Sequence, residues 1–157
     1  MAQKKAKKKP TGQKQITNRR ARHDYALGDS LLVGLVLTGA ETRNLRSGHG
    51  NLTGSYVNVI NDELWLINGT INGTSSAPIK DTDQTRTRKL LAKKREIASL
   101  IQAKQQGSTI VPLEILTSGR FIKIRIAVGK GKREYDKRQT LKARDQDREA
   151  RAAIKVR

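Results

Sequence analysis

Several residue types that carry chemistry are missing or scarce in this sequence. Its 157 residues include no cysteine, which excludes disulfides, thiolate zinc sites and thiol nucleophiles. Only His23 and His49 remain as nitrogen ligands, so we expect neither a metal site nor a cofactor. The longest apolar run, residues 31–37, is far shorter than the ~20 residues that cross a bilayer, and no secretory signal is recognisable. We therefore expect a cytoplasmic protein with no membrane partner.

Positive charge is in large excess and is concentrated at the two ends of the chain. The formal net charge is +19; residues 1–22 hold nine Lys or Arg and no acid, and residues 129–157 hold eleven bases against five acids. Such a balance predicts a polyanionic partner. Neither end has enough large apolar side chains to offset the entropy lost on ordering. We predict a disordered basic N-terminal tail at 1–15, an RNA-binding domain at 16–128 and a basic C-terminal tail at 129–157.

The central domain is dominated by a two-residue hydrophobic period. Residues 120–128 alternate, with the isoleucines on one face and Lys123 and Arg125 on the other, which predicts a half-buried strand. Asn61-Asp62 separates two apolar runs and predicts a tight hairpin. The run 31–37 is apolar enough to be buried on both faces. The run 109–116 contains Pro112, which predicts a position near a sheet edge.

Helices are predicted at fewer places. Thr38 and Glu41 fit a capping box, and Gly48 fits the end of the short helix that follows. Residues 86–105 have helical periodicity, with Arg88 at the border of the apolar half, and residues 67–83 read as a flexible loop. These elements predict a mainly β domain, a small antiparallel β-barrel similar to an oligonucleotide-binding fold with two or three packed helices.

Two local motifs invite a catalytic interpretation that the sequence does not support. The stretch from Gly129 to Lys132 lacks the spacing of a phosphate loop, and His23-Asp24 has no nucleophile nearby in sequence. We expect no enzyme and no catalytic residue. The basic cluster at Arg86, Arg88 and Lys89 fits either a solvated face, the usual meaning of a charge run, or contact with nucleic acid, which the overall charge favours. The isolated aromatic Tyr135 fits base stacking.

Four blocks of sequence, in the same order, carry a specific resemblance to a known family. They are Asn18 to Tyr25, Leu37 to Val57, Arg86 to Ile97 and Gly129 to Arg138. Together they resemble the SsrA-binding protein family, also called small protein B. Two positions depart from the family pattern: Leu32 stands where a carboxylate is usual, and His49 where a lysine is usual.

The resemblance implies a bacterial partner of transfer-messenger RNA in trans-translation. It implies that the barrel binds the tRNA-like domain and that the tail, disordered when free, becomes helical in the empty decoding centre and message channel, against the RNA of the small ribosomal subunit. Elongation factor Tu would be reached through the shared RNA. The predicted RNA-binding residues of the barrel are Asn18, Arg19, Arg20, Arg22, His23, Glu41, Arg46, Asn51, Arg86, Arg88, Lys89, Leu91, Lys123 and Arg125. The predicted ribosome-binding residues of the tail are Lys130, Lys132, Arg133, Tyr135, Asp136, Lys137, Arg138, Lys142, Arg144, Arg148 and Ile154.

Two other functions explain part of the sequence. A general basic RNA-binding or ribosomal protein would explain the charge and the barrel, but not the four ordered blocks. An RNA-processing nuclease or modifying enzyme is disfavoured because clustered carboxylates and paired histidines are missing. Selectivity for one tRNA-like RNA separates the first from the family reading, and a turnover assay with divalent metal separates the second.

Overall fold

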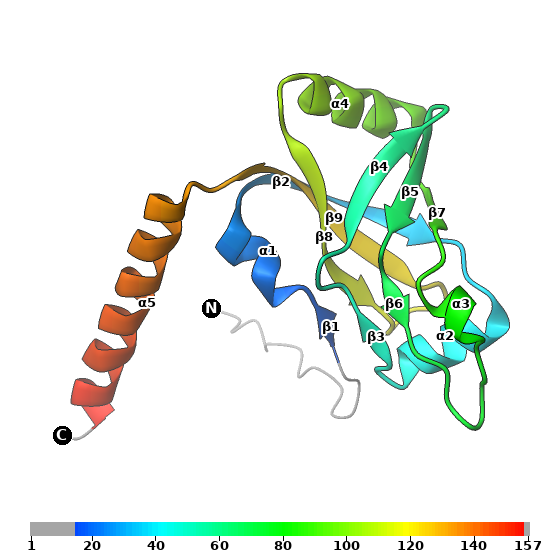
Figure 1. Cartoon of the computed structure of the whole chain (residues 1–157), viewed down its shortest axis with the longest axis horizontal. Helices are drawn as coiled ribbons and strands as arrows, with labels where there is room; N and C mark the ends of the chain where they lie inside the picture. Colours follow the sequence, from blue (N-terminus) through cyan, green and yellow to red (C-terminus); the bar gives the residue numbers. More distant parts are fainter. Residues whose placement is uncertain (1–14, 156–157) are drawn as a thin grey trace, which may run out of the picture.

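The computed structural model describes residues 15–155, without the side chains of Tyr135 and Lys155. The N-terminal tail predicted at 1–15 thus lies almost wholly outside the described residues. The described chain forms a barrel with helices around it (Figure 1), which confirms the predicted fold class. Its strands are β1 (Ile16–Thr17), β2 (Tyr25–Leu35), β3 (Gly50–Asn51), β4 (Tyr56–Ile60), β5 (Glu63–Ile67), β6 (Thr70–Ile71), β7 (Arg88–Leu91), β8 (Thr109–Leu116) and β9 (Lys123–Gly131). Its helices are α1 (Arg19–Asp24), α2 (Gly39–Arg46), α3 (Asp81–Gln84), α4 (Lys94–Gln105) and α5 (Glu134–Lys155).

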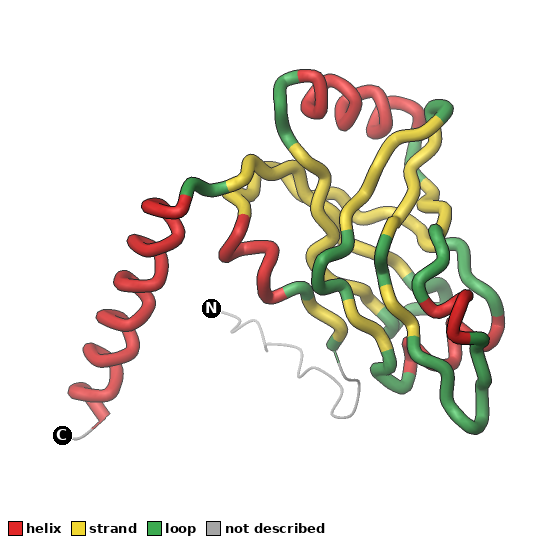
Figure 2. Tube along the Cα trace, in the orientation of Figure 1, coloured by secondary structure: helices red, strands yellow, loops and turns green. Residues whose placement is uncertain are grey.

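Seven strands pair antiparallel in the order β1-β8-β4-β5-β7-β2-β9, and a further pairing of β8 with β9 closes the ring. Figure 2 shows the strands enclosing one interior, with α4 across one end of the barrel. The long strand β2 joins β7 on one edge to β9 on the other. The inward side chains form the core with Leu45 of α2 and Leu100 of α4; those from the strands include Val33, Leu64, Leu66, Leu90, Ile110, Ile124 and Ile126.

The predictions from local sequence patterns are confirmed where the pattern is short and complete. In β9, Ile124 and Ile126 are fully buried while Lys123 is exposed, as the two-residue period predicts. Asn61 and Asp62 both have positive φ, 50° and 60°, as a type I′ hairpin turn requires. Thr38 and Glu41 form the capping box of α2.

The predicted helix at 86–105 is wrong in its first part. Residues 88–91 form strand β7, which pairs with β5 and β2, and α4 starts only at Lys94. Within β7, Leu90 is buried and Leu91 is 55% exposed, so the alternation belongs to a strand. Adjacent leucines also fit one helix face, and this is why periodicity alone misassigned them.

Two predictions about burial and edges are also wrong. Residues 31–37 are not buried on both faces, because Leu32 of β2 and Val36, directly after β2, are 42% and 44% exposed. Strand β8, which contains Pro112, is not an edge strand; it pairs with β9 on one side and with β4 and β1 on the other. Pro112 is tolerated because the β8–β9 register shifts between Pro112 and Glu114, at a bulge.

The connection at 67–83 is not a simple flexible loop. Residues 70–71 form β6, which pairs with β3, and Thr74 and Ala77 form a further β-bridge. The buried Asn44 of α2 donates to the carbonyl of Ala77 at 2.8 Å, which holds this segment against the helix. The segment is therefore part of the packed domain.

The C-terminal part begins later than predicted and is helical over most of its length. Strand β9 continues to Gly131, three residues past the predicted boundary at 128, and α5 covers 134–155. Figure 1 shows α5 beside α1 and projecting away from the barrel. Within the described chain, no helix combines the length and the apolar character needed to cross a membrane.

Candidate RNA interface

The predicted site residues differ widely in exposure, so they cannot all act in the same way. Buried side chains are those of Asn18, Glu41 and Arg88. Half-buried are His23, Arg86, Lys89, Arg125, Lys132 and Lys137. Exposed are Arg19, Arg20, Arg22, Arg46, Asn51, Leu91, Lys123, Lys130, Arg133, Asp136, Arg138, Lys142, Arg144, Arg148 and Ile154. The side chain of Tyr135, the predicted stacking residue, lies outside the described part.

Asn18 caps α1. Its Oδ1 accepts a hydrogen bond from the backbone N–H of Ala21, and its Nδ2 donates to the carbonyl of Pro112 at 3.1 Å. Both ends of the amide are thus used inside the fold. Asn18 fixes the start of α1 on strand β8, and through it the exposed side chains of Arg19, Arg20 and Arg22.

Arg88 is a structural residue, and its predicted position beside a helix is wrong. Its side chain is 0% exposed. Nε donates to Glu41, and the two terminal nitrogens donate to the carbonyls of Gly69, Arg86, Asp83 and Gln84. All five N–H groups of the guanidinium have protein acceptors, so this side chain has no donor left for RNA.

Glu41 is the centre of this ion network. Arg86 forms a two-pronged pair with it, at 2.8 and 2.7 Å, and Arg88 adds a third bond at 3.0 Å. Burial by itself would raise the pKa of Glu41, but the bonds from Arg86, the Thr38 N–H and Arg88 outweigh it and hold the pKa below its ordinary value. Burial lowers the pKa of Arg88, whereas the bond to Glu41 raises that of Arg86. The network joins α2 to β7 beneath the surface.

The outer face of β7, β2 and β9 carries an exposed apolar and basic surface. Leu91, Gly34 and Lys123 are register partners across the three strands. Next to this row, Arg125 pairs with Glu114 at 3.2 Å and remains 43% exposed. Lys89 is half-buried and is paired with Glu63. Of the predicted cations on this face, Lys123 is the one most open to a ligand.

Arg46 and Asn51 act on nearby backbone. The guanidinium of Arg46, at the end of α2, donates to the carbonyls of Thr117, Gly119 and Arg120, each at 3.0 Å. Asn51 accepts from the N–H of Thr53 at 2.8 Å. Arg46 therefore holds the β8–β9 connection, although its side chain also reaches the surface.

Helix α5 is fixed to α1 at its first turns. Asp24 accepts a bond of 2.8 Å from His23 and pairs with Lys137 of α5 at 3.7 Å. The hydrogen bond from His23 is the main reason that the pKa of Asp24 is lowered, with Lys137 contributing. The backbone N–H of Lys132 donates to the carbonyl of Asp24 at 2.8 Å, and its Nζ donates to that of Arg22. The His23–Asp24 pair thus helps to hold α5 against α1.

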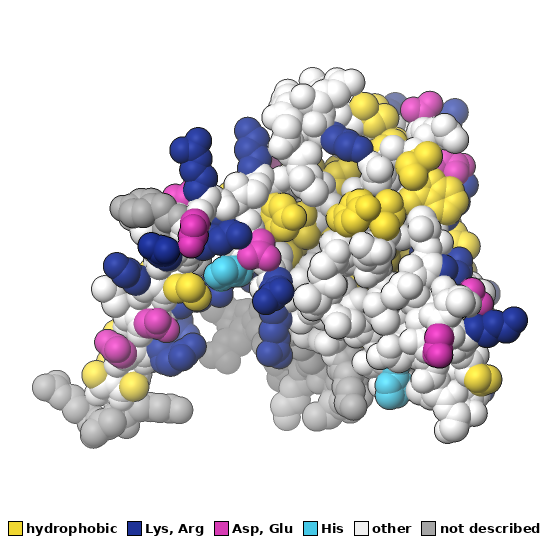
Figure 3. Space-filling model, viewed as in Figure 1, with side chains coloured by type: hydrophobic (Ala, Val, Ile, Leu, Met, Phe, Trp, Pro, Cys, Tyr) yellow, Lys and Arg dark blue, Asp and Glu magenta, His cyan; other side chains and the backbone are white. Residues whose placement is uncertain are grey.

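A hollow of about 510 Å³ lies among α1, the β8–β9 side of the barrel and α5. Four arginines from three separate parts of the chain line it: Arg19, Arg22, Arg125 and Arg144. Figure 3 shows Lys and Arg side chains gathered over α5 and the adjoining end of the barrel. The sequence alone does not reveal this hollow, because the arginines that line it are up to 125 positions apart (19 to 144). Glu114 also lines the hollow and pairs with Arg125, but the four arginines outweigh it, and the net positive charge suits phosphate groups.

Within residues 15–155, no group of three or more His, Cys, Asp or Glu is placed to hold a metal ion. A closed antiparallel barrel with cations and exposed apolar side chains on its outer strands, next to a basic helix, is typical of nucleic-acid-binding proteins of the oligonucleotide-binding type. Family comparison is more specific: the model of the SmpB protein matches residues 15–156, and the chain belongs to that family.

Relatives and one solved structure support this assignment. The chain is 44% identical over 140 residues to the SsrA-binding protein of Lactobacillus delbrueckii subsp. bulgaricus, which covers 88% of this chain and 92% of that protein. It is 40% identical to the SsrA-binding protein of Streptococcus suis, with 88% and 90% covered. A solved chain described as "tmRNA-SmpB: a journey to the center of the bacterial ribosome" aligns with a TM-score of 0.64 and 34% identity, over 81% of this chain and 94% of that one.

Proposed function

We propose that this chain is a partner of transfer-messenger RNA in trans-translation on the bacterial ribosome. Its relatives are SsrA-binding proteins, SsrA being the transfer-messenger RNA, and family membership extends over nearly the whole chain. The family consists of RNA-binding proteins and not of enzymes. The predictions of a transfer-messenger RNA partner in bacterial trans-translation and of a cytoplasmic location are thereby confirmed.

The barrel binds the tRNA-like domain of that RNA through the outer face of β7, β2 and β9 together with α1. A folded RNA is recognised by its shape, its phosphates and its unstacked bases, which requires placed cations beside apolar side chains. Lys123 beside Leu91, and the arginines of α1 around the basic hollow, form such a surface. This surface is the observation that carries the proposal.

Helix α5 occupies the decoding centre and the message channel, against the RNA of the small ribosomal subunit. Every described side chain from residue 141 to 154 is exposed, so none of them is buried against the barrel over that length. Lys142, Arg144 and Arg148 lie on it. Phosphate contacts would offset the cost of ordering this segment, so that binding depends on a channel free of message. Elongation factor Tu reaches the chain through the shared RNA.

A chain truncated after Arg133 tests this division of labour. Because it retains every strand and α1, it should bind transfer-messenger RNA with near-native affinity. It should fail to support peptide tagging on stalled ribosomes in a reconstituted translation system. Within the full chain, Tyr135→Ala should cost an amount typical of one lost base stack, ~1–3 kcal/mol, in ribosome engagement. Full tagging by the truncated chain would overturn the role of α5.

A general basic RNA-binding protein is the competing explanation, because charge alone gives affinity for any RNA. Titration at physiological salt distinguishes the two. The tRNA-like domain of transfer-messenger RNA should bind well above an unrelated stem-loop RNA of equal length. Equal affinities would favour the general binder.

A further inference from the structure

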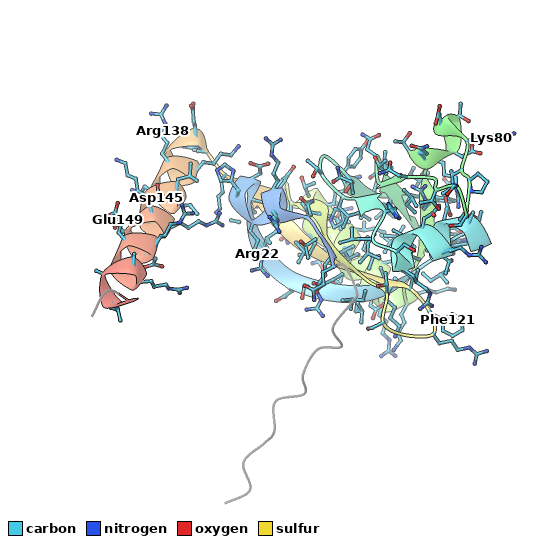
Figure 4. The ribbon with its side chains drawn as sticks, turned by 90° about the horizontal axis from the view of Figure 1, so that it is seen from below. Arg22, Lys80, Phe121, Arg138, Asp145 and Glu149 are labelled. Atoms are coloured by element: carbon cyan, nitrogen blue, oxygen red, sulfur yellow. The ribbon has the colours of Figure 1, made fainter. Side chains whose placement is uncertain are left out.

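Phe121 is an exposed aromatic side chain at the end of the barrel away from α5. It is 70% exposed, more than any other Phe, Tyr or Trp whose side chain is described. It lies in the connection between β8 and β9, directly before the buried Ile122. Figure 4 shows it at the edge of the molecule, far from Arg138 on α5. An exposed phenyl ring contributes little of the free energy that a protein gains when such a ring is buried.

The backbone that carries Phe121 is tightly held although the ring is not. Arg46 donates to three carbonyls of this connection, including that of Arg120, the residue before the ring. On the other side, the N–H of Leu35 donates to the carbonyl of Ile122 at 3.4 Å. Thr117 and Ile122, near the two ends of the connection, are buried. The ring is therefore presented to solvent from a fixed position.

The surroundings of the ring are cationic. The guanidinium carbon of Arg120 lies 5.4 Å from the ring centroid, within cation–π range. Lys123 follows two residues later and is exposed on the outer face of β9. The connection from 117 to 122 contains no acidic residue. An aromatic face beside fixed positive charge matches a nucleobase and its phosphates, whereas a protein-binding patch would need a wider apolar area.

We propose that Phe121 is a stacking platform for one unpaired base of the bound RNA, with Arg120 and Lys123 contacting the adjoining phosphates. This inference rests on the proposed function, since the RNA is the one that the barrel binds. Arg46 acts as a positioning residue for the platform. None of the sequence motifs singled out Phe121, because in sequence it lies at the start of an alternating strand.

Substitutions that separate aromatic stacking from apolar contact test the proposal. In the full-length chain, Phe121→Ala should weaken binding to the tRNA-like domain of transfer-messenger RNA roughly 5- to 150-fold, the range expected for one lost stack. The slope of log affinity against log salt should not change, because no phosphate contact is lost. Phe121→Tyr should bind like the original, and Phe121→Leu, which is apolar without a ring, should bind like Phe121→Ala. Ile60→Ala, which removes another exposed apolar side chain, is the matched control and should have no effect.

A direct measurement locates the stack. With Trp65→Phe as background, Phe121→Trp provides a single tryptophan whose fluorescence the RNA should quench at stoichiometric concentration. Native affinity of Phe121→Ala, or native affinity of Phe121→Leu, would overturn the proposal. A different measurement would contradict the proposed function itself. In that case the unsubstituted chain would not prefer the tRNA-like domain over an unrelated RNA.

Discussion

Glu41 in α2 and Arg88 in β7 form an ion pair of 3.0 Å in which the two side chains are 2% and 0% exposed. They are 47 positions apart in the sequence, and Arg86, 35% exposed, pairs with the same carboxylate from its more open side. An ion pair this deeply buried is costly to break from one side only, since the remaining charge stays in the interior. The charged cluster around β7 therefore has a buried, structural half and an exposed half.

Removing the buried arginine should destabilise the fold. We expect Arg88→Met to lower the free energy of unfolding by about 3–5 kcal/mol, because Glu41 loses a partner and four carbonyls lose their donors. Denaturant unfolding measures the change. The control is Lys123→Met, an exposed substitution expected to stay within ~0.5 kcal/mol. Equal stability of the two variants would contradict the structural role of Arg88.

The same network predicts a dependence of stability on pH. The pKa of Glu41 is lowered in the folded state from an ordinary value of 4.5, so its charged form is favoured by folding. This contribution is fully present above about pH 4.5 and is lost as the pH falls through the lowered folded-state pKa. The difference in unfolding free energy between the original chain and Glu41→Gln should therefore shrink as acid is added below pH 4.5. A difference independent of pH would contradict this assignment.

The exposed Lys123 on the outer face of β9 should contribute to RNA binding without contributing to stability. Lys123→Ala should weaken binding of the tRNA-like RNA and reduce the slope of log affinity against log salt by about one, the value for one lost phosphate contact. Lys80→Ala is a control on an exposed lysine elsewhere (Figure 4). An unchanged slope for Lys123→Ala would remove Lys123 from the interface.

The contact between α1 and α5 should stabilise the first turns of α5 against local unfolding. Asp24→Asn removes the charge that pairs with Lys137 and His23. Because these groups are partly exposed, the loss of global stability should be under ~1 kcal/mol. Amide hydrogen exchange should nevertheless become faster at residues 134–140. Asp147→Asn, on an exposed part of α5, should leave that region unchanged, and equal exchange in both variants would refute the contact.

Local patterns in the sequence predicted those elements whose determinants are close together. The Thr38–Glu41 capping box needs four residues, and the Asn61-Asp62 turn needs two with positive φ. The alternation in β9 is complete over its first half. In each case the physical cause, a satisfied N–H, a permitted backbone conformation or a buried face, acts within one element.

The errors arose where a distant partner decides the outcome. Burial of Arg88 depends on Glu41 and on backbone carbonyls from 69 to 86, which nothing local to β7 reveals. The loop that presents Phe121 is held by Arg46, which lies in helix α2, far from the loop in sequence. The basic hollow joins arginines from α1, β9 and α5. Family resemblance identified the RNA partner, but it did not separate the residues that support the site from those exposed on it.

Strand β9 leads into α5 through Lys132 and Arg133 alone, and Lys132 is itself bonded to Asp24 and Arg22. Because this junction is short and hydrogen-bonded to α1, it restricts movement of α5 relative to the barrel. Helix α5, 22 residues long, is a rod of about 33 Å. If the barrel binds RNA through the proposed surface, its position on that RNA sets the direction in which this helix points. Through this junction, the orientation of the barrel determines where the far end of α5 lies, about one helix length away.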